Sequence, residues 1–391
     1  MPDFIQEARE HFTYTRDLRR DFHRNPELAF HEIRTAGVVA RELKSLNLEV
    51  STGIARTGVV ALLEGAKPGP AVLLRFDMDA LPIQEDTGAE YASQNPGVMH
   101  ACGHDGHTAI GLTAARILQK YRQDLAGTLK FVFQPAEEGF YGAATMVAEG
   151  VMENPKIDLT LALHLWNNKP LGWLGITAGP VMAAADIFKV TLTGKGGHGA
   201  IPDLAVDPVL TSAQVITALQ SIVSRNVSPL QTAVVSVTMV RGGDAFNIIP
   251  SEVALQGTIR TYEKQVRESV LSHFHQIVTQ VAGAMGCQSE IEITPLSPAV
   301  INDPGITRHV ERTATRIFPD NQIDSAFRTM GSEDMSEMME KVPGCYFFIG
   351  SANPEKGFNA PHHHPKFDVD ETALERAVAL VTATAYDLMK G

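Results

Sequence analysis

Short, almost entirely apolar runs alternate with stretches of helical periodicity up to about residue 166. The apolar runs are typical of buried strands and lie at 58–65, 71–78, 128–134 and 159–166. Apolar residues at helical spacing predict helices at 4–24, 32–47 and 108–123. Strands that alternate with helices predict an α/β fold in which a mostly parallel sheet is flanked by helices.

The pattern changes after residue 185, where apolar and polar residues begin to alternate in "DIFKVTLTG". Strands and helices are now expected in the order β-α-β-β-α-β, which is the split βαβ order of a ferredoxin-like unit. They cover 186–194, 208–225, 232–240, 252–262, 263–285 and 289–296. We therefore expect an inserted ferredoxin-like α+β lid or dimerisation domain at 186–295, between two parts of a catalytic domain at 1–185 and 296–391.

Length, charge and cysteine content disfavour several classes of protein. At 391 residues the chain is longer than one hydrophobic core usually supports, which again favours two domains. Its 33 basic and 45 acidic residues give a net charge of −12, so we expect neither nucleic acid nor membranes as partners. We find no leader sequence and no apolar run of about 18 residues, which favours a cytoplasmic protein. The three cysteines are odd in number and far apart, which argues against a disulfide framework.

The stretch "MHACGHDGH" (99–107) combines one cysteine with three histidines. Cys102 and His104 are two residues apart, so in an extended or looping chain they project to the same side. Thiolate and imidazole suit Zn²⁺ and also accept Mn²⁺ or Co²⁺. The alternative is a structural turn that holds no metal, and one C-x-H pair does not decide between the two.

Further side chains that bind metals stand where apolar runs stop. Glu137 and Glu138 follow the strand at 128–134, and because neighbouring side chains diverge, one can bind an ion while the other takes a proton from water. His164 lies near the end of "LTLALHLW", and three histidines at 362–364 precede the last helix. Ligands gather at the carboxyl ends of strands in open α/β sheets. The alternatives are a solvated acidic turn and a buried structural histidine.

Together these positions supply five candidate ligands. They are Cys102, His104, Glu138, His164 and one histidine at 362–364. Five ligands exceed the four of a closed structural zinc site and the three of a common catalytic one. Two ions that share a ligand would use all five at a separation of about 3.5–4 Å, with the thiolate of Cys102 as the candidate bridge.

Six motifs occur in the order and spacing seen in the M20 metallopeptidase family, and they span essentially the whole chain. They are "RFDMDALP", "HACGHDGH", "FQPAEEG", "GKGGHGAIP", "FNIIP" and "HHPKFDVDE". The chain resembles in particular the amidohydrolase branch, with its aminoacylases, hippurate hydrolases, indole-acetyl-amino-acid hydrolases and related carboxypeptidases. The resemblance implies a binuclear metal centre, a ferredoxin-like lid that usually forms a dimer, and hydrolysis of an amide bond next to a free carboxylate.

The resemblance also implies roles for residues of the catalytic domain. The implied metal ligands are Cys102, His104, Glu138, His164 and His363. Glu137 would be the general base, and Asp79 would orient a ligand histidine, although Asp77 stands where the wider family has that histidine. His107 and Asp105 would support the ligands rather than bind metal.

In the lid, the resemblance makes His198 of "GKGGHGAIP" a donor to the oxyanion that reaches the active site of the partner subunit. Asn247 and Arg260 would meet the substrate carboxylate, with Arg260 as a bidentate partner. Without the resemblance, His198 is simply a histidine in a surface turn. Arg260 is then a solvated residue on an alternating strand.

We therefore expect a metal-dependent amidohydrolase, homodimeric or larger, that holds two divalent ions: Zn²⁺ or Mn²⁺, with Co²⁺ and Ni²⁺ as alternatives. It would cleave the amide bond of N-acyl or N-aminoacyl amino acids with a metal-bound hydroxide and Glu137 as general base. The main alternative is a dipeptidase or carboxypeptidase that acts on short peptides. Another is a catalytically inactive relative that binds an amino acid derivative. A two-metal phosphoesterase is disfavoured by the cysteine ligand and by the lack of a phosphate-cradling glycine loop.

Overall fold

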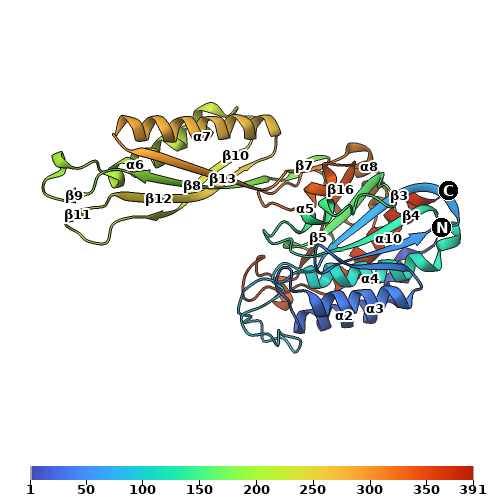
Figure 1. The fold of residues 1–391 in the computed structure, drawn as a ribbon. Helices are drawn as coiled ribbons and strands as arrows, with labels where there is room; N and C mark the ends of the chain where they lie inside the picture. The colour runs from blue at the N-terminus through green and yellow to red at the C-terminus, as the bar shows by residue number, and fades with distance from the viewer. Residues whose placement is uncertain (1, 391) are drawn as a thin grey trace. The chain divides into compact units, whose positions relative to one another are not determined.

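The computed structural model describes residues 2–390, and this part of the chain divides into two compact units (Figure 1). Unit 1 comprises the chain up to Val181, Ile301–Arg328 and the chain from Asp334 onward. Unit 2 comprises Met182–Val300 and the short segment Thr329–Glu333. The predicted boundaries of the inserted domain, 186 and 295, lie a few residues inside Met182–Val300.

Unit 1 is built on an eight-stranded sheet (Figure 1). Its strands are β1 (Glu49–Ile54), β2 (Gly58–Glu64), β3 (Lys67–Asp77), β4 (Ala126–Gln134), β5 (Leu159–Pro170), β6 (Trp173–Gly175), β15 (Gln322–Asp324) and β16 (Gly344–Ala352). Their order in the sheet is β1-β2-β4-β3-β5-β16-β6-β15. The central strands β4, β3, β5 and β16 are parallel, whereas β1, β2 and β6 pair antiparallel to a neighbour. The expected mostly parallel α/β sheet is therefore confirmed.

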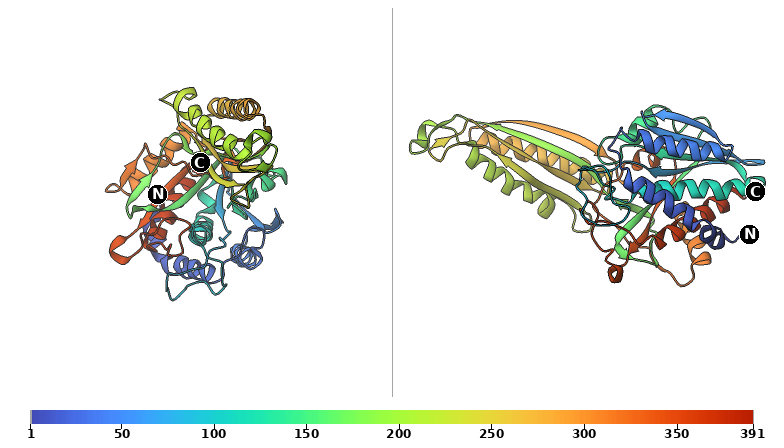
Figure 2. Two further views of the ribbon diagram at one scale, coloured as in Figure 1. Left: turned by 90° about the vertical axis from the view of Figure 1, so that its left-hand side faces the viewer. Right: turned by 90° about the horizontal axis from the view of Figure 1, so that it is seen from below.

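Helices of unit 1 cover this sheet and each other. They are α1 (Phe4–Glu10), α2 (Phe12–Arg24), α3 (Ile33–Ser45), α4 (His104–Lys120), α5 (Gly142–Ala148), α8 (Pro304–Ile317), α9 (Ser336–Met339) and α10 (Thr372–Met389). α4 and α10 pack against each other and against the parallel strands, while α1 packs on α10, so the first and last helices lie side by side (Figure 2). Among residues 2–390, no helix has the length and apolar character needed to cross a bilayer.

Two predicted helix boundaries were wrong. The single helix expected at 4–24 is interrupted at His11, whose backbone N–H closes α1 by donating to carbonyls of that helix. The helix expected to begin at 108 begins at His104, because its polar first turn hides it from a search for apolar periodicity.

Glycines let α4 approach the sheet closely. A Cβ atom at Gly106 would lie 2.7 Å from Cδ1 of Leu165, and one at Gly111 would lie 2.5 Å from Cδ2 of Phe76. These separations are too short for van der Waals contact, so a larger residue at either position would force the side chain of Leu165 or Phe76 to shift. The close packing fixes the first turn of α4 against β3 and β5.

Unit 2 has the ferredoxin-like arrangement that the sequence predicts. Its elements are β8 (Ala184–Thr193), α6 (Pro208–Ser221), β10 (Ala233–Arg241), β12 (Glu252–Thr261), α7 (Lys264–Ala284) and β13 (Gln288–Ser297). The antiparallel sheet has the order β10-β12-β8-β13, and α6 and α7 bury its apolar face. The side chain of Asp207 begins α6 by accepting hydrogen bonds from the N–H groups of Val209 and Leu210.

Short elements complete the chain. They are η1 (Arg122–Asp124), β7 (Gly179–Met182), β9 (Gly197–His198), η2 (Pro202–Leu204), η3 (Ile222–Asn226), β11 (Ile248–Ile249), β14 (Val300–Asn302) and η4 (Pro354–Lys356). Within unit 2, β9 and β11 pair as a small antiparallel ribbon.

Candidate metal centre

The segment before α4 brings Cys102 and His104 together. Gly103 between them has φ +95°, a left-handed conformation that glycine adopts without steric cost. Gly103 is the N-cap of α4, so Cys102 precedes the helix and His104 is its first residue. From β5, Nε2 of His164 lies 3.5 Å from Sγ of Cys102. Ligand atoms of Cys102, His104 and His164 all lie within 4.8 Å of one another.

The turn after β4 carries the two adjacent carboxylates. Ala136 has φ +58°, and this left-handed residue reverses the chain directly before Glu137. Oε2 of Glu137 lies 4.0 Å from Nε2 of His104, whereas Oε1 of Glu138 lies 3.3 Å from Nε2 of His363. Each carboxylate thus approaches a different histidine, and oxygen atoms of both also lie within 4.8 Å of each other and of a ring nitrogen of His104.

The three adjacent histidines before α10 have different environments. The backbone N–H of His363 donates to the carbonyl of Ala101 over 2.8 Å, which places its ring beside Glu138. Nε2 of His362 lies 3.0 Å from the carbonyl of Leu165. His364 is exposed and accepts a hydrogen bond from the N–H of Lys366 at its Nδ1 atom. Of the three, His363 alone belongs to a cluster of possible ligands within the described residues.

Asp79 connects two parts of the site. One of its carboxylate oxygens accepts a hydrogen bond from the backbone N–H of Glu138 over 3.0 Å. Nδ1 of His104 lies 2.9 Å from the Asp79 carbonyl and 3.3 Å from its other carboxylate oxygen. Both acceptors favour a proton on Nδ1, so Nε2 is the nitrogen of His104 that a metal ion would bind.

These side chains have the chemistry of a metal site. Sγ of Cys102 belongs to two ligand clusters, one with His104 and His164 and the other with Glu138 and His363. Nε2 of His104 is buried and has no hydrogen-bond partner among the described residues. Such an atom is costly to bury unless an unseen partner satisfies it. Thiolate, imidazole and carboxylate together fit a divalent cation such as Zn²⁺.

The electrostatic environment also favours a cation. Burial raises the pKa of the Cys102 thiol well above its usual value, and the carboxylates of Glu138 and Glu137 raise it further. Burial lowers the pKa of His104, but the carboxylates of Asp77 and Asp79 outweigh this effect and raise it to about 10. Burial, aided by other histidines, lowers the pKa of His164 well below its usual value, so its ring is neutral. The pKa values of Cys102 and His104 are both raised by nearby carboxylates, whose negative charge a divalent cation would compensate.

Unit 2 brings two of its three predicted site residues together. His198 is exposed in β9 and pairs with Ile248 of β11, directly after Asn247. The Asn247 carbonyl also accepts a hydrogen bond from the N–H of Gly199 over 2.8 Å. This ribbon lies at one end of unit 2 (Figure 1). Arg260 lies at the opposite end of β12 from the ribbon, about 26 Å away along the strand.

Comparisons with known proteins identify the family. The model of peptidase family M20/M25/M40 matches residues 73–387. The chain belongs to this family. It is 39% identical to the N-acetylcysteine deacetylase of Bacillus subtilis over 92% of both chains. It is also 38% identical to thermostable carboxypeptidase 2 of Saccharolobus solfataricus, over 92% of this chain and 91% of the relative. The structure of the Bacillus subtilis YXEP protein, described as a dinuclear metal-binding M20 peptidase, superimposes with a TM-score of 0.85 at 34% identity, covering 97% and 99% of the two chains.

As an M20 family member the protein is an enzyme, a hydrolase of the peptidase and amidohydrolase type. Asp77 is the last residue of β3 and is fully buried. One of its oxygens lies 2.6 Å from Nδ1 of His107, and the other lies 2.7 Å from Nη1 of Arg75. Nε2 of His107 in turn accepts a hydrogen bond from the N–H of Leu165 over 2.9 Å. Both nitrogens of His107 thus have a partner in the chain, although the ring also belongs to a group of possible ligands with Asp77 and His104.

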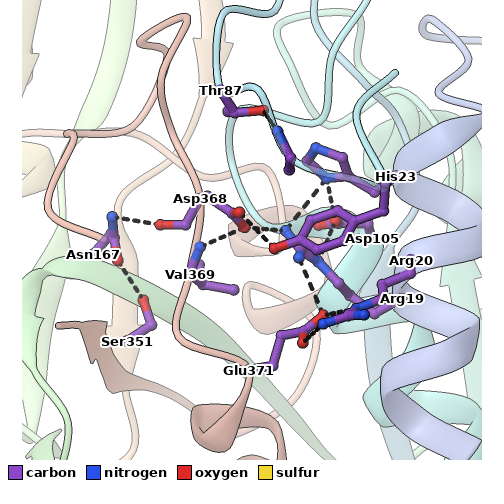
Figure 3. Close-up of polar contacts among 12 residues, drawn as sticks. Arg19, Arg20, His23, Thr87, Asp105, Asn167, Ser351, Asp368, Val369 and Glu371 are labelled. Carbon is purple, nitrogen blue, oxygen red and sulfur yellow. Dashed lines mark hydrogen bonds and ion pairs between the residues drawn. The ribbon is translucent and has the colours of Figure 1, made fainter. Parts of the chain in front are cut away.

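A buried polar network joins α2 to residues that lie close in sequence to candidate ligands of this M20 enzyme (Figure 3). Arg19 of α2 is fully buried and donates to Asp105, which follows His104 in α4. Arg19 also donates to Asp368, on the segment that follows His363. His23 lies 2.7 Å from the same oxygen of Asp105.

Sequence reasoning missed Arg19, Arg75 and Glu32 in this M20 fold. All three side chains are at most 1% exposed, although charged residues are almost never fully buried without partners. A signal was visible for Arg75, a charge inside the apolar run "AVLLRFDM". The other two stand among polar residues and carry no such signal.

Proposed function

We propose that this M20 hydrolase is a metal-dependent amidohydrolase that cleaves the amide bond of N-acyl amino acids with a free carboxylate. The observation that carries the proposal is the sharing of Cys102 between two ligand clusters, beside Glu137. A relative named N-acetylcysteine deacetylase, 39% identical over nearly the whole chain, supports the substrate class.

The proposed cofactor is a pair of divalent ions. The proposed ligands are Cys102, His104, Glu138, His164 and His363, with Cys102 as the bridge. Sulfur and imidazole donors suit Zn²⁺ and also accept Mn²⁺, Co²⁺ or Ni²⁺. When bound, the ions would lower the pKa of a water molecule and polarise the scissile carbonyl group.

Glu137 is the proposed general base. Its carboxylate lies 4.0 Å from Nε2 of His104, close enough to act on a water molecule held at the proposed ligands. It would accept a proton from the attacking water and then deliver that proton to the nitrogen of the leaving amine. Asp79 would keep the ring of His104 and the turn of Glu138 in place.

Residues of unit 2 would complete the substrate site. His198 is proposed to donate a hydrogen bond to the oxyanion, and Asn247 and Arg260 are proposed to bind the substrate carboxylate. Because Arg260 lies about 26 Å along β12 from the ribbon of His198 and Asn247, one copy of unit 2 cannot bring all three to one small substrate. We therefore propose a homodimer in which two chains contribute to each site.

The surface of unit 2 supports dimer formation. β10 is an edge strand of the four-stranded sheet, and Val240 on it is 54% exposed. Val209 and Leu210 at the start of α6 are 47% and 51% exposed. An edge strand beside exposed apolar residues is a surface that a second copy can cover.

A carboxypeptidase acting on short peptides is the second candidate. The 38% identity to thermostable carboxypeptidase 2 favours it, and both reactions cleave an amide beside a free carboxylate. The two activities differ in whether the group on the nitrogen is an acyl group or a peptide.

A substrate panel tests the proposal. The purified protein, loaded in turn with Zn²⁺, Mn²⁺, Co²⁺ and Ni²⁺, is assayed with N-acetyl amino acids, N-benzoylglycine, dipeptides and N-blocked peptides. Preferred release of amino acids from the N-acyl compounds would support the amidohydrolase, and preferred peptide cleavage would support the second candidate. Absence of turnover with every metal would contradict both and favour an inactive binding protein.

A further inference from the structure

Hydrogen bonds fix two peptide groups in the turn of the proposed general base, Glu137. The carbonyl of Ala136 accepts a hydrogen bond from the N–H of Gly142 over 3.1 Å. The carbonyl of Glu137 accepts one from Gly139 over 2.6 Å, and the N–H of Glu138 donates to Asp79. One group remains to be fixed, the peptide before Ala136, and it determines whether Ala136 keeps its left-handed φ of +58°.

Glu32 holds that remaining peptide group. Its Oε1 atom accepts a hydrogen bond from the N–H of Ala136 over 3.0 Å, across 104 residues of sequence. Its Oε2 atom accepts a hydrogen bond from Oγ1 of Thr57 over 2.5 Å. The Glu32 side chain is fully buried, so these contacts form in a place from which water is excluded.

Capping of α3 does not explain the burial of Glu32. It is the N-cap residue of α3, yet its side chain makes no capping hydrogen bond to that helix. The carboxylate of Glu27 instead accepts hydrogen bonds from the N–H groups of Arg34 and Thr35 in the first turn. Loss of the Glu32 carboxylate would therefore leave the cap of α3 intact.

We propose that Glu32 is a positioning residue for catalysis, which holds Ala136 in its left-handed conformation and so aims the carboxylate of Glu137. Glu32 accepts a hydrogen bond from the N–H of residue 136 and Asp79 accepts one from the N–H of residue 138, one on each side of Glu137. An alanine seldom adopts positive φ unaided, so without Glu32 the turn would relax toward other conformations. The inference rests on the proposed role of Glu137.

Three substitutions at Glu32 separate the hydrogen bond from the charge. Glu32→Gln keeps an acceptor for the Ala136 N–H and a polar group beside Thr57. Burial, aided by Asp79, raises the pKa of Glu32 to about 7, so a neutral side chain suits this environment. Glu32→Ala removes both contacts. Glu32→Asp keeps a carboxylate but is one methylene too short to reach, and it serves if the alanine variant does not fold.

The first measurement is hydrogen–deuterium exchange of peptides that cover residues 130–142, which needs neither substrate nor metal. Exchange should be faster in Glu32→Ala and Glu32→Asp than in the wild type, and unchanged in Glu32→Gln. The control is Asp158→Ala, which removes a 2.8 Å carboxylate hydrogen bond to the N–H of Ala71, near the start of β3 and away from the site. Unchanged exchange in all three Glu32 variants would overturn the proposal, whether or not the proposed function is correct.

The second measurement is steady-state kinetics with the best substrate of the panel. We expect kcat to fall roughly 10–100-fold in Glu32→Ala and Glu32→Asp, with KM changed by less than about threefold, because a displaced base affects the chemical step. The acid limb of the pH–rate profile, which reports the base, should shift in the same variants. Glu32→Gln and Asp158→Ala should behave as the wild type. Faster exchange with unchanged kcat and pH profile would show a purely structural role and overturn the proposal.

Discussion

Nε of Arg19 lies 2.7 Å from Oδ2 of Asp105, and both side chains are at most 1% exposed. Nη2 of the same arginine lies 2.6 Å from Oδ1 of Asp368 (Figure 3). One buried cation thus joins α2 to the residue after His104 and to the segment after His363. The carboxylates compensate for the desolvation of Arg19, and removing the arginine leaves both buried carboxylates without their guanidinium partner.

Replacement of Arg19 tests whether the stability of the fold depends on these buried ion pairs. Arg19→Met should lower the free energy of unfolding by about 3–5 kcal/mol, because Asp105 and Asp368 would remain buried without their cation. The measurement is urea denaturation followed by circular dichroism. Arg16→Met is the matched control in α2, since Arg16 pairs with the exposed Asp17, and it should cost less than about 1 kcal/mol. Equal losses in both variants would contradict the role of the buried network.

His23 should make stability depend on pH. Burial and Arg19 lower its pKa, but hydrogen bonds to Asp105 and Glu85 outweigh them and raise it to about 8. Since the folded pKa lies above the unfolded value of about 6.5, the contribution is present below pH 6.5 and is lost as pH rises through 8. The shift corresponds to roughly 2 kcal/mol.

The measurement is the free energy of unfolding of the wild type and of His23→Gln at pH 6 and pH 9. The wild type should lose about 2 kcal/mol more than the variant between these two values. A variant with the same pH dependence as the wild type would remove His23 as the cause.

Glu137→Gln should separate chemistry from metal binding. Glutamine cannot take a proton from water, so we expect kcat to fall by about 10²–10⁴. Because Glu137 is proposed as base rather than ligand, the metal content measured by plasma mass spectrometry should equal that of the wild type. Glu138→Gln is the matched neighbour and should lose metal as well as activity. Near-full activity of Glu137→Gln would assign the base to another residue.

Cys102→Ser should lower metal content, because one replacement removes the atom common to both ligand clusters. Serine has nearly the same shape, but its hydroxyl is not readily deprotonated and binds Zn²⁺ weakly compared with a thiolate. The metal-to-protein ratio after dialysis measures the effect. Cys287→Ser, a change at a buried cysteine of unit 2, is the control and should keep the wild-type ratio. A full ratio in Cys102→Ser would refute its role as the bridge.

Apolar patterning was enough to predict the strands that carry the site. β3, β4 and β5 are buried near their carboxyl ends, and the polar residues that follow them converge as the geometry of parallel strands requires. Patterning failed at the first turn of α4, because "HDGH" buries polar side chains whose partners come from distant segments. Sequence spacing cannot reveal those partners.

The same limit applies to residues that hold the site in place. The hydrogen bond between Glu32 and Ala136 spans 104 residues, and the link between Arg19 and Asp368 spans 349. Neither contact produces a recognisable pattern in the local sequence, because its contribution to stability comes from burial that only the folded chain creates. The distance between Arg260 and the ribbon that holds His198 likewise follows from strand register, because Arg260 pairs with Ala185 near the start of β8. The motifs in the sequence do not reveal that register.

Arg260 should determine recognition of the free carboxylate. Burial lowers its pKa, and its Nη1 atom is buried without a hydrogen-bond partner among the described residues, so the group has a donor available for a ligand. Arg260→Met should lower kcat/KM for N-acyl amino acids by about 10–100-fold, mainly through KM, which is the effect of losing one charged hydrogen bond. The same variant should hydrolyse the corresponding N-acyl amino acid amides, which lack the carboxylate, as well as the wild type does. Arg241→Met, at an exposed arginine on β10, is the control and should leave both rates unchanged. Equal losses on the acid and the amide substrates would show that Arg260 supports the sheet of unit 2 rather than binding the carboxylate.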